Sequence, residues 1–153
     1  MALNTDFTSG QILTAAQMNN MPRGIVSATI GTASSASVAV ETVILTSPSF
    51  TAVANRYYRI TYLQPAFTYQ SGTVNSVGMN IRLTNIAGAV QVSTEVKMAS
   101  AGTCTGVASI VKTLTAGPTV FVATFTPSGG GSVIASGATV YGAQLIIEDM
   151  GST

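Results

Sequence analysis

Apolar and polar side chains alternate along most of the chain after Gly24. The clearest case is the segment 76–83, SVGMNIRL, in which every second residue from position 77 is apolar. A period of two places successive side chains on opposite faces of an extended strand, so that one face is buried. This pattern is typical of antiparallel sheets, because strands of parallel sheets are covered on both faces and read as continuous apolar runs. The same alternation is found in residues 38–45, 56–63, 90–97, 109–114, 119–125 and 139–149.

Breaks rich in glycine, proline and serine separate these segments, such as TSPS at 46–49 and PSGGGS at 127–132. About seven to nine strands with no helix between them predict an antiparallel β-sandwich, jelly-roll-like in the first place and immunoglobulin-like in the second. The 153 residues suit one hydrophobic core, and we see neither a repeat at solenoid spacing nor a second domain. We therefore expect an all-β domain over residues 24–153.

A short helical segment precedes the strands. Thr14 and Gln17 have the spacing of a capping box, and Pro22 prevents the helix from continuing. A helix of one or two turns is not stable alone in water, so it must dock on another surface. We predict that residues 1–23 form an attachment arm. The residues expected to carry the attachment are Phe7, Ile12, Leu13, Thr14, Gln17, Met18 and Met21.

Charged residues make up only 7% of the chain, compared with about a quarter in an average protein. The six basic residues are scattered, whereas binding to phosphates needs clustered lysine and arginine. No apolar run reaches the roughly 18 residues that span a membrane, and the first residues lack the features of a signal peptide. We therefore expect neither nucleic acid nor a membrane as a partner. A surface with so little charge favours a protein that packs against neighbours.

The residue types of common active sites are scarce. The absence of histidine removes the usual general base and the commonest metal ligand. Glu148 and Asp149 are adjacent on a predicted strand, so their side chains should point to opposite faces. Glu41 and Glu95 could meet like a glycosidase pair, but we expect both on outward faces, where they serve solubility. Cys104 is the single cysteine, and we expect a small buried or half-buried side chain. The sequence therefore predicts no enzyme, no metal and no cofactor.

The aromatic segment YYRITYLQPAFTY has residues suited to two environments. We expect Tyr58, Tyr62 and Phe67 to fill the core, because buried aromatic rings remove large areas from water. Tyr57 and Tyr69 are the residues that we expect at a surface or a subunit contact.

Two stretches resemble small structural proteins of tailed bacteriophages. FTSGQILTAAQMNNMPRGIV, at residues 7–26, is similar to their opening segment, F-x-x-G-x-x-L-T-A-A-x-x-N, which leads into the first strand. AQLIIEDMG, at residues 143–151, resembles their closing strand, an apolar run followed by Glu-Asp and a glycine. Between these ends the likeness is one of composition only, in strands rich in threonine, serine and valine. The matching positions are Phe7, Gly10, Leu13, Thr14, Ala15, Ala16, Asn19, Glu148, Asp149 and Gly151.

The resemblance implies a non-enzymatic virion protein, a jelly-roll-like homotrimer on the outer surface of a phage, assembled in the host bacterial cytoplasm. Its partners would be other copies of itself and the major capsid protein or tail proteins. A compact body with an arm suits a capsid decoration protein that bridges neighbouring subunits, with residues 7–22 bound to the trimer or the virion. The alternative is a minor tail or tail-fibre protein involved in host attachment, although the chain has no repeat that would form a shaft.

A second alternative from another class is a carbohydrate-binding module or adhesin. In that case Tyr69 and the loops QSGTVNS, at residues 70–76, and PSGGGS, at residues 127–132, would contact host glycans. This function predicts exposed aromatic rings at one end of the sandwich and glycan binding by the isolated domain.

Overall fold

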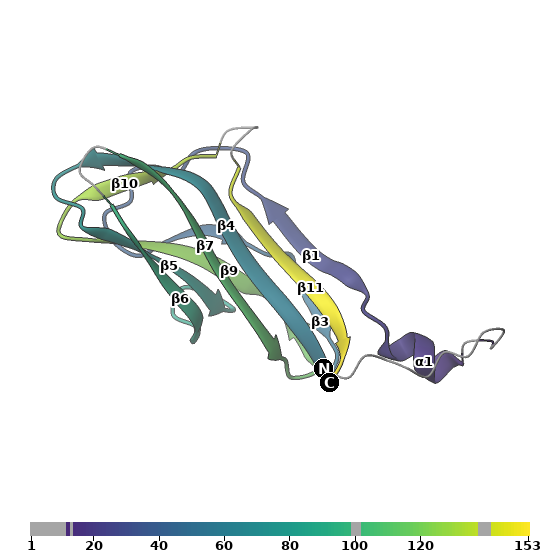
Figure 1. The fold of residues 1–153 in the computed structure, drawn as a ribbon. Coiled ribbons are helices and arrows are strands. Elements are labelled where there is room, and N and C mark those ends of the chain that lie inside the picture. Colours follow the sequence, from purple (N-terminus) through teal and green to yellow (C-terminus); the bar gives the residue numbers. More distant parts are fainter. Residues whose placement is uncertain (1–11, 13, 99–101, 138–141) are drawn as a thin grey trace.

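A computed structural model describes residues 12, 14–98, 102–137 and 142–153. These residues form antiparallel sheets and one short helix, as the alternating pattern predicted (Figure 1). The elements are α1 (Ala15–Asn20), β1 (Gly24–Ile30), β2 (Thr42–Thr46), β3 (Phe50–Ala52), β4 (Arg56–Ser71), β5 (Ser76–Leu83), β6 (Val90–Lys97), β7 (Thr103–Thr113), β8 (Gly117–Thr119), β9 (Phe121–Ser128), β10 (Ser132–Ala135) and β11 (Gln144–Ser152).

Two sheets pack face to face. In the first sheet β1 pairs with β11, β11 and β10 pair with successive parts of β4, and β7 pairs with the other edge of β4. The second sheet has the order β2-β9-β5-β6, and β3 and β8 form a separate pair. The first strand thus pairs with the last, and β1 and β2 lie in different sheets. This connectivity is the double Greek key of a jelly roll. An immunoglobulin sandwich instead keeps its first two strands in one sheet.

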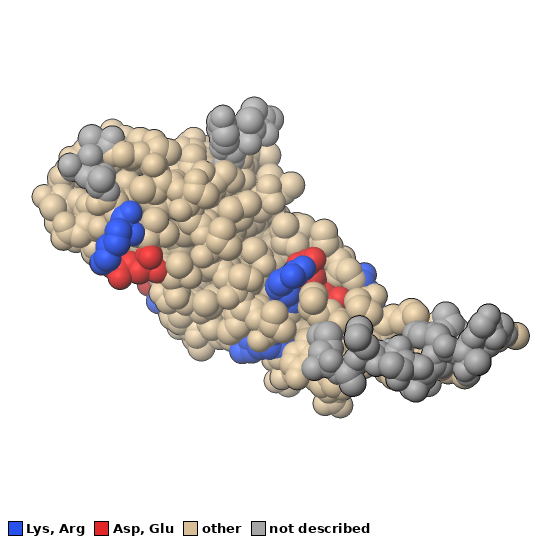
Figure 2. Space-filling view, in the orientation of Figure 1, with Lys and Arg blue, Asp and Glu red and all other residues tan. Residues whose placement is uncertain are grey.

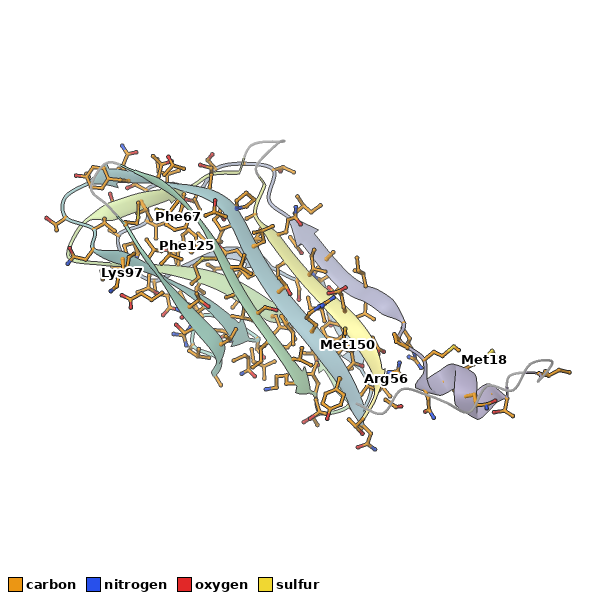
Figure 3. The ribbon with its side chains drawn as sticks, in the orientation of Figure 1. Met18, Arg56, Phe67, Lys97, Phe125 and Met150 are labelled. Atoms are coloured by element: carbon orange, nitrogen blue, oxygen red, sulfur yellow. The ribbon has the colours of Figure 1, made fainter. Side chains whose placement is uncertain are left out.

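The core lies between the sheets and contains the aromatic residues predicted for it. Tyr58, Tyr62 and Phe67 of β4 are buried. The ring of Phe125, on β9, lies 5.8 Å from that of Tyr62 and 5.3 Å from that of Phe67, measured between centroids. Figure 3 shows Phe67 and Phe125 together between the sheets. Alternation on two facing strands therefore supplies the aromatic centre of the core.

The segment 38–45 does not form the single strand that its alternation predicted. Val38 makes only an isolated bridge with Val133, and β2 begins at Thr42. Residues 39 and 40 bend instead, and the Glu41 carboxylate that follows them binds Arg82 on the second sheet. The short strands β3, β8 and β10 were not predicted, because three or four residues are too few to display a period.

Candidate functional site

The helix α1 begins with the predicted capping box. The Thr14 hydroxyl accepts a hydrogen bond from the Gln17 N–H at 3.2 Å, and the Gln17 side-chain oxygen accepts one from the Thr14 N–H at 2.9 Å. These bonds satisfy two of the backbone donors that a helix leaves open at its start. The helix has six residues and ends at Asn20, and its C-cap Met21 lies directly before Pro22.

The described apolar side chains of the arm are exposed. Ile12 is 90% exposed, Met18 is 54% exposed, and Met21 is also an exposed hydrophobic residue. Figure 3 shows Met18 on α1, apart from the two sheets. Thr14 is exposed and Gln17 is half-buried. The predicted attachment residues Phe7 and Leu13 lie outside the described residues. The expected docking of these apolar side chains therefore does not occur within one chain for the residues that the structure describes.

The end of α1 is held by Arg56, at the start of β4. Its guanidinium donates hydrogen bonds to the backbone oxygens of Asn19 and Met21 and, through Nε, to Asp149 Oδ2 at 2.6 Å. The Arg56 and Asp149 side chains are 4% and 1% exposed, so this ion pair is buried. A cation at the end of a helix satisfies carbonyl groups that have no partner in the helix itself. We call Arg56, Asp149 and the two carbonyls the arm latch.

The two stretches that carry the phage resemblance meet at the arm latch. Asp149 Oδ1 accepts a hydrogen bond from the Gly151 N–H at 2.9 Å, and Gly151 has φ +104°. A Cβ atom at Gly151 would lie 3.1 Å from the backbone oxygen of Asn20, so glycine allows the arm to approach closely. Segments more than a hundred positions apart in the sequence therefore form one site.

Arg56 was not among the site residues predicted from the sequence, although a signal for it existed. Arg56 has the same alternation phase as the buried Tyr58, and Asp149 has the same phase as the buried Leu145. Two opposite charges at buried positions of two strands would have indicated a pair if the strands had been known to be neighbours. The prediction that Glu148 and Asp149 point to opposite faces is confirmed, since Asp149 is buried and Glu148 pairs with an exposed arginine.

The first sheet has an outer face that is apolar for much of its area. Ile25, Ile30, Val107 and Val111 are exposed there, at 62%, 62%, 47% and 52%. Strand register places these residues in rows across four strands. We define the outer face as Ile25, Ala28 and Ile30 of β1, Gln144, Ile146 and Glu148 of β11, Arg59, Thr61 and Leu63 of β4, and Val107, Ser109 and Val111 of β7.

Charge on the outer face is confined to one internally neutral pair. Arg59 Nε donates a hydrogen bond to Glu148 Oε2 at 2.7 Å, and mainly this bond lowers the pKa of Glu148. Figure 2 shows that charged side chains on the visible surface are few and lie in small, separate groups. Tyr57, predicted at a surface or subunit contact, is half-buried on the same strand as Arg59. The outer face therefore presents little net charge to a partner.

The two middle strands of the second sheet, β9 and β5, carry polar side chains on their outward side, while Val43 of β2 and Val90 of β6 are exposed nearer its edges. Glu41 accepts two hydrogen bonds from Arg82, at 2.7 and 2.8 Å, and others from Asn80 and Thr124. The Arg82 hydrogen bonds are the main cause of the lowered pKa of Glu41. Glu95 is exposed and pairs with Lys97 at 2.9 Å. Its pKa is lowered too, chiefly by a hydrogen bond from Ser76. Neither carboxyl has the raised pKa that a glycosidase acid needs, so this arrangement does not favour the catalytic alternative.

Tyr69 and the two loops of the glycan alternative lie at the end of β4 that is far from the arm. The Tyr69 side chain is half-buried against the core, and its hydroxyl donates a hydrogen bond to the Gly72 oxygen at 2.7 Å. The loops are tied together by hydroxyl pairs, between Ser71 and Ser132 at 2.8 Å and between Ser76 and Ser128 at 2.7 Å. The Tyr69 hydroxyl and the buried part of its ring therefore hold the loop at Gly72, and only the rest of the ring is open to a ligand.

The described residues offer little for metal or thiol chemistry. Within ranges 14–98, 102–137 and 142–153, no three acidic or cysteine side chains gather as a metal site would require. Cys104 is half-buried, with Sγ 3.8 Å from the Lys97 oxygen. No helix in the described part is long and apolar enough to cross a membrane.

The chain matches no protein-family model and no curated protein sequence.

Replacing both charges of the arm latch, Arg56→Met with Asp149→Asn, should free α1 and leave the sandwich folded. Removing both partners leaves no unpaired charge in the interior, whereas Arg56→Met alone should cost about 3–5 kcal/mol of stability. Trypsin should then cleave after Arg23 faster than in the unmodified protein, as measured by mass spectrometry of the released arm.

The matched control is Arg59→Met with Glu148→Gln, which removes the exposed ion pair from the same two strands. It should leave cleavage after Arg23 unchanged. Equal cleavage rates in both double variants would show that the latch does not hold the arm.

The Glu41 cluster should make the fold less stable in acid. Because the pKa of Glu41 is lowered in the folded state, its contribution is present above the ordinary value of 4.5 and is lost as pH falls through the lowered value. Glu41→Gln should therefore lower the urea midpoint at pH 6, and its difference from the unmodified protein should shrink as the pH falls below 4.5. Glu95→Gln is the control, and it should change little because exposed pairs contribute little. Parallel pH curves for Glu41→Gln and the unmodified protein would contradict this assignment.

Proposed function

We propose that this protein is a non-enzymatic structural component on the outside of a bacteriophage particle, a decoration protein that binds neighbouring capsid subunits. The observation that carries the proposal is the exposed apolar surface of α1 and the outer face, in a chain with 7% charged residues. Monomeric soluble proteins rarely expose contiguous apolar patches, and such patches mark sites of association. The phage assignment itself rests on the resemblance of residues 7–26 and 143–151.

The outer face is the surface that we assign to other copies of this chain. Its rows of isoleucine and valine contrast with the second sheet, where Glu41 and Arg82 occupy the outward side. Self-association through the apolar sheet would cover Ile30 and Val107 and leave the polar sheet in solvent. The neutral Arg59–Glu148 pair places no net charge between the copies. We infer a homotrimer, the state that the resemblance implies.

The arm is the segment that we assign to the capsid. The arm latch fixes the end of α1 near Asn19 and Met21, and it leaves the side chains of Ile12 and Met18 open. A helix that is already capped and held loses less conformational freedom when it binds than a free peptide does. The apolar side chains would then supply the contact with a neighbouring virion protein.

A decoration protein of this kind acts by passive contact. Each copy would bridge neighbouring subunits, and modest affinities are multiplied when the sites are linked in an array. The alternative of a minor tail or tail-fibre protein uses the same surfaces in another place. The number of copies per particle distinguishes them, since a count on the scale of the capsid lattice supports decoration and a handful supports the tail.

A chain that begins at Gly24 should fold and fail to join the particle. The sandwich keeps its core and the Arg56–Asp149 pair, while the exposed apolar residues of the arm are lost. Circular dichroism should still report β-structure, and particles assembled with the shortened protein should lack it on a gel. A gentler variant, Ile12→Gln with Met18→Gln, keeps the helix and should weaken incorporation. Normal incorporation of the shortened chain would rule out the arm as the attachment segment.

Val107→Lys should weaken self-association. A lysine in the middle of the outer face would place a charge where apolar side chains meet, and we expect the dissociation constant to rise about tenfold or more. Analytical ultracentrifugation measures this directly. Ser93→Lys, on the exposed side of β6, is the control and should leave the association unchanged. An unmodified protein that stays monomeric would contradict the assignment of the outer face.

A further inference from the structure

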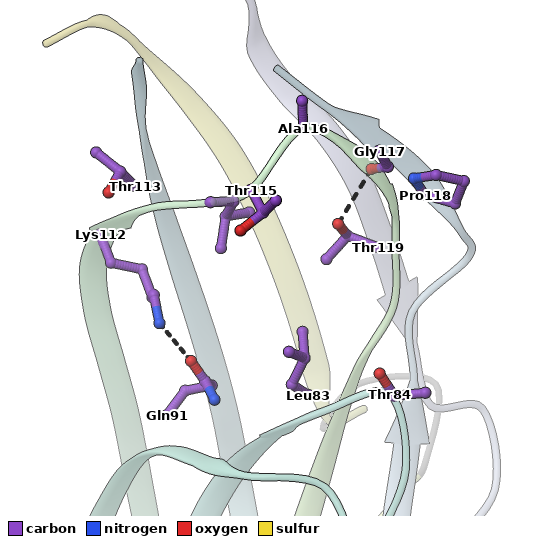
Figure 4. A pocket seen from close by; sticks show the side chains of 11 residues that line it. Leu83, Thr84, Gln91, Lys112, Thr113, Thr115, Ala116, Gly117, Pro118 and Thr119 are labelled. Carbon is purple, nitrogen blue, oxygen red and sulfur yellow. Dashed lines mark hydrogen bonds between the residues drawn. The ribbon is translucent and has the colours of Figure 1, made fainter. Parts of the chain in front are cut away.

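A hollow of about 350 Å³ opens between the two sheets, at the end of the sandwich where β4 begins (Figure 4). It lies between the end of β5, the start of β6 and the end of β7, and the segment 113–119 forms its rim. Lys112 pairs with Tyr58 near the start of β4, whereas the glycan loops predicted from the sequence follow the other end of that strand. The hollow is therefore a different site from the loops around Tyr69.

Lys112 gives the hollow a positive charge that no described carboxylate neutralises. The other basic residues each lie within 4.0 Å of a carboxylate oxygen. In the described part of the chain, the Lys112 ammonium group instead donates to the neutral side-chain oxygen of Gln91. Lys112 also has the alternation phase of the buried Ala108, so its side chain points between the sheets. An ammonium group has three donors, which leaves capacity for an anionic ligand.

Thr84, in the lining of the hollow, has a strained backbone. Its φ is +71°, in the left-handed region that β-branched residues rarely adopt. The conformation is held by a hydrogen bond from the Thr84 N–H to the Val120 oxygen at 2.8 Å. Glycine would relieve the strain, but it would also remove the hydroxyl group that lines the hollow. Strain of this kind is concentrated at ligand sites, because a side chain is kept there at a cost in stability.

We propose that the hollow binds a sugar that carries a carboxylate, of the uronic acid class. Figure 4 shows Lys112 and Gln91 on one side and the side chains of Thr84 and Thr119 on the other. The ammonium group would bind the carboxylate, and the threonine hydroxyls and the Gln91 amide would bind the ring hydroxyls. Leu83, which is partly exposed at the same place, would face the apolar side of the ring. A phosphate group fits less well, because it is usually bound by several cations or by a row of backbone N–H groups.

The test is a titration of the isolated full-length chain, so its outcome does not depend on the proposed virion role. Sodium glucuronate is added while amide signals are followed by NMR, with glucose and sodium acetate as separate probes. Glucuronate should shift the amides of Lys112 and Thr84 in a saturable way, and glucose and acetate should bind at least about tenfold more weakly. Equal shifts with acetate and glucuronate would show a simple anion site and overturn the sugar assignment.

Three variants separate binding from structure. Lys112→Met should reduce the affinity for glucuronate about tenfold or more, and Lys97→Met, which removes a paired and exposed lysine, should not change it. Thr84→Gly should raise the urea midpoint and lower the affinity, a combination that a purely structural threonine would not give. Unchanged affinity in Lys112→Met, or no saturable shift with glucuronate, would overturn the proposal. Lys112 would then be only an inward-pointing charge that hinders the edge strand β7 from pairing with a strand of another chain.

Discussion

Pairing along both edges of strand β4 is the constraint on which the rest of the molecule depends. β4 pairs with β7 on one edge and with β11 and β10 on the other, so its sixteen residues connect most of the first sheet. Its inward side chains have different roles along the strand. Arg56 holds the arm, Tyr58 and Tyr62 fill the core, and Gln64 binds the backbone beyond β10. Core formation and arm placement are therefore properties of one strand.

Burying polar groups in this core requires that each has a partner, and the structure meets that requirement. Tyr58 accepts a hydrogen bond from the Val53 N–H at 2.9 Å, and the Gln64 amide donates to the oxygens of Ala66 and Ser136 at 2.6 and 2.7 Å. No buried side-chain nitrogen or oxygen of the described residues lacks a hydrogen bond. An unpaired buried polar group would cost about 1–3 kcal/mol, which is more than the net gain of a typical hydrogen bond. These bonds therefore specify how the loops join the sandwich.

The two sheets differ in the side chains that they expose, and the proposed association with neighbouring subunits rests on this difference. The second sheet has the Glu41 cluster in the middle of its outward side, whereas the first presents isoleucine, valine and one neutral ion pair. The arm extends the apolar surface beyond the sandwich through Ile12 and Met18. A free monomer with this surface would tend to associate, and the proposed contacts with neighbouring subunits would cover its apolar side chains.

The sequence by itself determined the class of fold, the capping box at Thr14 and Gln17, and the aromatic centre of the core. These features are local, because a period of two or a spacing of three residues can be counted along the chain. Only the tertiary structure decided the strand order, the bend at residues 39–40, and the contact of Arg56 with Asp149 and the end of α1. Alternation shows which face of a strand is buried and contains no information about the neighbouring strand. The arm latch joins residues 93 positions apart, and the hollow at Lys112 needs three strands to form, so neither could be counted along the chain.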